Sequence, residues 1–126
     1  MMKEVKFYRC PICGNVVYLA QEKGGQLVCC GKPMELMNAN ESDGAIEKHV
    51  PVYEVKEDKL IVKIGEVLHP MTEEHYIVFV AIASDNGLDI VNLKPGDDPI
   101  CEFSLVSKGT IYAYCNLHGL WKCEIK

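Results

Sequence analysis

The chain has 126 residues and a formal net charge of −5, from 13 Lys and Arg against 18 Asp and Glu. This acidic balance argues against a nucleic-acid-binding protein, which would carry a basic face. The longest strongly apolar run, Ile77 to Ala83, is far shorter than the roughly 20 residues of a membrane helix. The first residues turn charged at once and form no apolar signal core, so we expect a cytoplasmic protein with no membrane span.

Cysteine and histidine are the informative residue types, with seven Cys and four His in the chain. A reducing compartment does not support a disulfide framework, and seven thiols do not pair evenly in any case. Most of the cysteines are clustered, which favours metal binding over scattered, inert thiols. Cys101 and Cys123 lie outside the clusters, and we expect them to be ordinary buried or half-buried thiols.

Residues 1–37 are predicted to form a small N-terminal unit that is held together by a metal. Cys10 and Cys13 flank a tight turn, and Cys29 and Cys30, separated from them by 15 residues, provide a second pair. Two such pairs place four sulfurs around one ion, and so short a unit has too little core to fold without this support. Zinc and iron both accept four thiolates, so the residues alone leave the metal open.

The adjacent cysteines, Cys29 and Cys30, are an unusual ligand pair. Neighbouring residues of an extended chain point to opposite sides, so two adjacent thiols share one ion only where the backbone kinks. Gly31 follows directly and permits such a kink.

Residues 38–44 are polar and turn-rich and are predicted to be a linker. Residues 45–126 contain seven short β-prone runs separated by turn residues, with no convincing helix. This pattern predicts an all-β chain whose second domain is a seven-stranded, immunoglobulin-like sandwich. The predicted strands are Val52–Val55, Lys59–Ile64, Tyr76–Ala83, Leu88–Leu93, Glu102–Val106, Thr110–Tyr114 and Leu120–Ile125.

All four histidines fall in this second domain, each next to a predicted strand end or turn. They are His49, His69, His75 and His118, and Cys115 lies three residues before the last of them. Four imidazoles and one thiolate exceed the closed tetrahedron that structural zinc prefers. Four nitrogens in a plane and an axial sulfur leave a sixth position open, which suits iron that reacts with a small molecule. Blue copper is the nearest rival, but its axial Met is missing because no Met follows Met71.

Taken together and in this order, these segments resemble the desulfoferrodoxin family, the two-iron form of superoxide reductase. Cys10-x-x-Cys13 with Cys29-Cys30 is similar to the desulforedoxin-like iron site of that family. The other matching segments are Glu47-Lys48-His49-Val50-Pro51, His69-Pro70, His75-Tyr76 and Cys115-Asn116-Leu117-His118-Gly119. The resemblance spans nearly the whole chain.

The resemblance implies two iron ions per chain, one with four Cys ligands and one with four His and one Cys. It implies reduction of superoxide to hydrogen peroxide with electrons from a rubredoxin-type donor, and it implies a homodimer. Glu47 and Lys48 are implied to be functional, Glu47 as a ligand of the oxidised iron. Because superoxide is an anion and the chain is acidic, we expect Lys48 to provide local steering.

Two other hypotheses compete with this one. A non-catalytic iron electron carrier would use both metal sites but would not need an open coordination position. An interaction module stapled by zinc would be colourless, whereas iron–thiolate sites absorb visible light.

Overall fold

A computed structural model describes residues 5–41 and 44–126 of the chain. The chain divides into two compact units, the first ending at Asn38 and the second beginning at Ala39. The predicted domain boundaries, at residues 37 and 45, stay predictions, and residues 42–43 of the predicted linker lie outside the described residues.

The first unit contains five very short strands: β1 (Phe7–Arg9), β2 (Val16–Tyr18), β3 (Val28–Cys29), β4 (Lys32–Pro33) and β5 (Glu35–Leu36). Strands β2, β1 and β5 form one antiparallel sheet, and β3 and β4 form a separate hairpin. Of its described residues, only Phe7 and Cys10 are buried. So small a core supports the expectation that a metal staples this unit.

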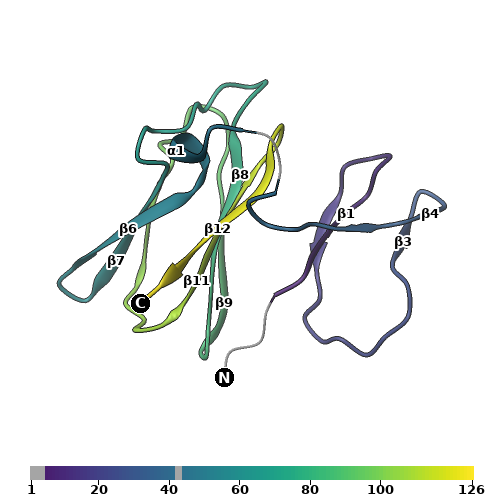
Figure 1. Ribbon diagram of the computed structural model, residues 1–126, viewed down its shortest axis with the longest axis horizontal. Helices are drawn as coiled ribbons and strands as arrows, with labels where there is room; N and C mark the ends of the chain where they lie inside the picture. Colours follow the sequence, from purple (N-terminus) through teal and green to yellow (C-terminus); the bar gives the residue numbers. More distant parts are fainter. Residues whose placement is uncertain (1–4, 42–43) are drawn as a thin grey trace. The chain divides into compact units, whose positions relative to one another are not determined.

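The second unit is built from seven strands among its described residues: β6 (Pro51–Lys56), β7 (Lys59–Ile64), β8 (Ile77–Ser84), β9 (Gly87–Asn92), β10 (Ile100–Ser104), β11 (Gly109–Cys115) and β12 (Gly119–Ile125). They form a three-stranded sheet in the order β10-β7-β6 and a four-stranded sheet in the order β12-β11-β8-β9 (Figure 1). Each predicted run overlaps one strand, and the all-β prediction with a sheet-rich second domain is confirmed.

The core of the second unit follows the two-residue period of its strands. On β7, Leu60, Val62 and Ile64 are fully buried while the residues between them are partly exposed. They pack with alternate residues of β11, which end at Cys115. Cys101 belongs to the same core, as expected for an ordinary buried thiol. The core therefore continues up to the strand end that carries the one cysteine near the histidines.

A single helical turn, α1 (Ile46–His49), is the one helix among the described residues, and the sequence analysis missed it. Its cap is a backbone bond from the Val50 N–H to the Ile46 carbonyl (3.0 Å). It ends there because Pro51 disfavours helical backbone at the residue before it. No helix in the described part of the chain is long and apolar enough to cross a membrane.

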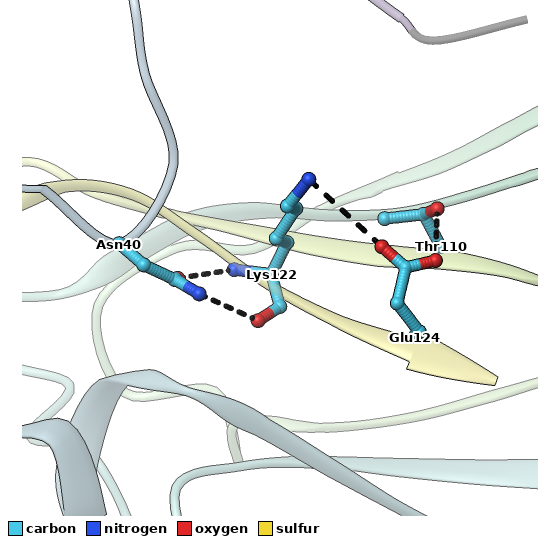
Figure 2. A network of polar contacts seen from close by, with 4 residues as sticks. All are labelled: Asn40, Thr110, Lys122 and Glu124. Carbon is cyan, nitrogen blue, oxygen red and sulfur yellow. Dashed lines mark hydrogen bonds and ion pairs between the residues drawn. The ribbon is translucent and has the colours of Figure 1, made fainter.

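Part of the predicted linker is bound to the second unit. Asn40, with a φ of +65°, donates from its backbone N–H to the Leu120 carbonyl (2.9 Å). Its side chain accepts from the Lys122 N–H (2.8 Å) and donates to the Lys122 carbonyl (3.2 Å), as Figure 2 shows. Strand β12 is an edge strand, so these bonds satisfy backbone groups that would otherwise be open to another chain.

Candidate metal centres

The four clustered cysteines of the first unit converge in space. Their sulfurs all lie within 4.8 Å of one another, with Cys13 and Cys29 3.6 Å apart and Cys29 and Cys30 4.0 Å apart. Metal–sulfur bonds of about 2.3 Å give a tetrahedron with edges of about 3.8 Å, so the spacing fits one ion.

The adjacent pair shares this site because Cys30 and Gly31 form the two-residue turn between β3 and β4. Both have positive φ values, 53° and 74°. Two such residues are typical of a type I′ hairpin turn, which reverses the chain and redirects the Cys30 side chain. A left-handed conformation costs a non-glycine residue about 1 kcal/mol or more, so this turn marks a functional constraint.

The charges of the four sulfurs require a cation. The Cys13 backbone N–H lowers the pKa of Cys10 to about 6, whereas the neighbouring Cys13 side chain raises the pKa of Cys29 to about 12. Neighbouring thiols also raise the pKa of Cys30, so Cys29 and Cys30 lose their protons at neutral pH only when a metal binds. The donor set fits an iron ion with four Cys ligands.

The four histidines and Cys115 of the second unit also converge. Neighbouring ring nitrogens, taken in the order His69, His49, His118 and His75, are 3.1, 3.1 and 3.2 Å apart. A square with an edge of 3.1 Å has its centre about 2.2 Å from each corner, close to a metal–imidazole bond. The Cys115 sulfur lies 3.8 Å from the His118 Nδ1.

These five ligand atoms come from three segments that meet at one end of the sandwich. Helix α1 carries His49, and the segment between β7 and β8 carries His69 and His75. Cys115 ends β11, and His118 lies in the loop that follows it. The loops and α1 lie at the upper end of the second unit in Figure 1. The register of β11 with β8 shifts between Tyr114 and Cys115, so Cys115 pairs with Ile77 at an irregular point of the ladder.

Backbone carbonyls fix the orientation of the two most buried rings. The Nδ1–H of His49 donates to the Ala45 carbonyl and that of His69 to the Pro70 carbonyl, both at 2.7 Å. Each bond places the proton on Nδ1 and leaves Nε2 free as a metal ligand.

Trp121 is a second feature that the sequence analysis missed. Its indole stacks on His49 with the ring centroids 5.0 Å apart, and its Nε1–H donates to the His118 carbonyl (3.0 Å). Trp121 is only 1% exposed, so one buried side chain supports two candidate ligands. The one feature of the sequence that could have indicated this role is that Trp121 follows the predicted ligand His118 by three residues.

Burial favours the neutral, metal-binding form of three of the imidazoles. It lowers the pKa of His49 and His75, and it lowers that of His69 to about 4. Burial also raises the pKa of the Cys115 thiol, so metal binding there releases a proton. Five donors exceed a closed zinc tetrahedron and fit the iron site with four His and one Cys.

We predict that acid weakens the metal-free protein through these rings. The folded-state pKa of His69 lies below its ordinary value of 6.5, so the unfolded chain binds more protons between about pH 6.5 and 4. Lowering the pH through that window should therefore remove roughly 2–3 kcal/mol of stability through His69 alone. Urea unfolding can be followed by the fluorescence of the single Trp, Trp121. A His69→Gln variant should show a shallower loss, and parallel pH profiles would contradict the prediction.

Glu47 and Lys48 lie on the same helical turn as His49 and are exposed, whereas His49 is buried. After the dominant effect of burial, the Lys48 ammonium contributes to lowering the pKa of both His49 and His75. A positive charge therefore acts on the site from its solvent side.

Comparisons with known proteins agree with this architecture. The family model described as desulfoferrodoxin matches residues 41–124, and that of the desulfoferrodoxin N-terminal domain matches residues 2–37. A desulfoferrodoxin homolog of Archaeoglobus fulgidus is 46% identical over 97% of this chain and 98% of its own length.

Two solved structures extend the comparison. The superoxide reductase of Treponema pallidum is 31% identical, with a TM-score of 0.77 over 96% of this chain and 99% of its own. The superoxide reductase of Giardia intestinalis, described as a 1Fe-SOR, is 28% identical with a TM-score of 0.55. It is matched over 98% of its own length by 64% of this chain.

Proposed function

This chain belongs to the desulfoferrodoxin family, and from that membership and its metal-site geometry we infer that it is a superoxide reductase. The observation that carries the proposal is the convergence of four ring nitrogens and one sulfur at one end of the sandwich. His49, His69, His75, His118 and Cys115 would hold one iron ion, and Cys10, Cys13, Cys29 and Cys30 would hold a second.

When bound, the iron of the histidine site supplies the electron that, with two protons, converts superoxide to hydrogen peroxide. The chain's own residues prepare that site. The backbone carbonyls of Ala45 and Pro70 hold the rings of His49 and His69 in the binding tautomer. Cys115 adds a negative sulfur in the buried end of the core, where it favours electron donation. The open coordination position stays a prediction.

A superoxide pulse under anaerobic conditions, combined with metal analysis, tests the proposal. The reduced protein should contain two irons per chain and form one hydrogen peroxide for each superoxide, without oxygen. A dismutase would release one oxygen for every two superoxide ions, and an electron carrier would leave most of the superoxide to decay unaided. Either result, or zinc at both sites, would refute the function.

We propose that Lys48 steers superoxide towards the site, because the protein as a whole has a charge of −5 and repels anions. Lys48→Ile should slow association several-fold and flatten its dependence on ionic strength. Lys56→Ile is the matched control, because it changes the net charge equally. Lys56 ends β6, about 17 Å from the first residue of that strand, Pro51. Equal rates and equal salt slopes in the two variants would exclude steering by Lys48. Glu47, beside it, stays a predicted ligand of the oxidised iron.

We propose that the iron held by four cysteines is a structural staple. The Giardia protein is matched by fewer residues than the second unit contains, so a superoxide reductase does not require a unit like the first. We predict that Cys13→Ser destabilises the first unit but leaves turnover with superoxide unchanged. The measurement is donor-dependent turnover of the variant beside its parent, and a large loss of turnover would favour an electron relay instead.

We also propose a homodimer, a rubredoxin-type electron donor and a cytoplasmic location. The first unit exposes Ile12, Val28 and Leu36 by 59, 57 and 45%, which supports burial against a second copy. Ile46 and Leu117, next to candidate ligands, are 67 and 60% exposed and suit contact with a small donor protein. A reducing compartment suits a chain whose seven cysteines are all free. Sedimentation and donor-dependent turnover test the first two proposals.

A further inference from the structure

The four imidazoles of the second site are not anchored in the same way. His49 and His69 are 2 and 3% exposed, and each is held through its own ring by a carbonyl. His75 is more exposed. Its Nε2 lies 3.2 Å from another candidate ligand atom, the His118 Nδ1, rather than against a backbone carbonyl. A metal site needs its ligands oriented before the metal binds, so His75 requires support from elsewhere.

The side-chain amide of Asn116 forms hydrogen bonds with the backbone on both sides of His75. Its Oδ1 accepts from the Tyr76 N–H at 2.9 Å, and its Nδ2 donates to the Glu74 carbonyl at 3.0 Å. The backbone N–H of Asn116 also donates to the Tyr76 carbonyl (3.2 Å). Two bonds from the Asn116 side chain therefore hold the peptide groups that flank His75, and the backbone bond holds the next one.

We propose that Asn116 is a positioning residue, which orients His75 through the backbone rather than through the ring. The proposal rests on the proposed function only in taking His75 as an iron ligand. An amide is the side chain that suits this position, since it offers one acceptor and one donor at its tip. Aspartate would face the Glu74 carbonyl with a second acceptor, and alanine would leave both backbone groups unpaired.

The same clamp links two of the three ligand-bearing segments. Asn116 lies between Cys115 and His118, and its contacts are to the residues on either side of His75. Elsewhere in this segment, the Met71 carbonyl accepts from the Gly96 N–H (2.9 Å), and Thr72 and His75 exchange backbone bonds of 3.0 and 3.2 Å. Without Asn116, the backbone around His75 would lose its side-chain bonds to the loop that follows Cys115.

The rate of iron release from the holoprotein tests whether the bonds from Asn116 to Glu74 and Tyr76 position His75. With an excess of a ferrous chelator, Asn116→Ala should lose the iron of the histidine site about 10- to 100-fold faster than the parent. Removing a group that orients a metal ligand weakens metal binding by about this factor. The iron held by four cysteines in the same molecule is an internal control and should leave at the parental rate. Asn92→Ala, an exposed asparagine at the end of β9, is the matched substitution and should change neither rate.

A local spectroscopic readout separates positioning from general loosening. In the reduced protein, Asn116→Ala should shift the paramagnetic NMR signal of the His75 ring N–H while those of His49 and His69 stay in place. Equal displacement of all ring signals, or an unchanged His75 signal with parental iron release, would overturn the proposal. These readouts do not depend on superoxide, so they fail or succeed apart from the proposed function.

Amide hydrogen exchange in the parent holoprotein keeps the test decisive if the variant does not fold. The Tyr76 N–H should be strongly protected because Asn116 accepts its hydrogen bond. Exchange at the rate of an open loop amide would show that the clamp does not form, and the proposal would then be wrong.

Discussion

Replacing Cys115 by alanine is expected to reduce the iron content of the purified protein from two ions per chain to one. The side chain is fully buried and supplies the sulfur among the donors of the histidine site. Four neutral imidazoles remain, but the charge that offsets a divalent ion is gone, and the buried ion loses its anionic partner. The visible absorption of that site should disappear, while that of the four-cysteine site remains.

Cys101→Ala is the matched control for this substitution. Cys101 is also buried, at 6% exposure, and belongs to the same core cluster. Both substitutions remove one sulfur atom from the core and should cost similar stability, about 1–2 kcal/mol. The Cys101 variant should keep both irons, as measured by elemental analysis and visible spectra. Two irons in the Cys115 variant, or one in each, would contradict the role of Cys115.

The strands and the ligand set were predictable because both follow from local patterns. The run Lys59–Ile64 is rich in β-prone apolar residues and ends at a glycine, and it forms β7 with the bounds expected. The predicted ligands form short motifs next to turns. Side chains at strand ends and in the adjoining loops gather at one end of a β-sandwich. Residue types, their positions beside turns and the resemblance to the desulfoferrodoxin family together indicated which residues converge.

Helix α1 was not predictable from the same patterns. It has four residues, which is below the length at which a helical period is visible in a sequence. It exists because tertiary contacts hold it, including the bond from the Val67 N–H to the Glu47 carbonyl (2.9 Å). The kink at Cys30 was expected, but its left-handed backbone at the first turn position emerged only from the structure.

The supporting contacts were also beyond the sequence. The carbonyl of Ala45 and the indole of Trp121 act on His49 from residues that carry no recognisable motif. A backbone carbonyl is present at every residue, so its role depends entirely on where the chain places it. The ligands of such a site are thus readable from residue types, whereas their orientation requires the fold.

Gly65→Ala is expected to damage the same site from a residue that binds nothing. Gly65 has a φ of +85°, and a Cβ there would lie 2.5 Å from the Val67 carbonyl oxygen and 2.6 Å from that of Lys48. Both are backbone atoms, so neither can rotate away. The turn after β7 would have to push α1 outwards, and α1 carries both Lys48 and His49. We expect a loss of roughly 2–4 kcal/mol in stability, with slower superoxide association and faster iron release.

Gly96→Ala separates backbone strain from the steric clash. Gly96 has a similar φ of +92°, but a Cβ there meets nothing within 4 Å. That variant should lose only the roughly 1 kcal/mol of a left-handed non-glycine residue and should keep its iron and its rate. Urea unfolding, iron release and pulse radiolysis measure the three quantities. If both variants lose stability equally and neither loses iron, the contact between Gly65 and the Lys48 carbonyl does not position α1. If only Gly65→Ala releases iron faster, the orientation of His49 depends on Gly65, which lies 16 residues further along the chain. The reason would be that a side chain at this position collides with the Lys48 carbonyl of α1.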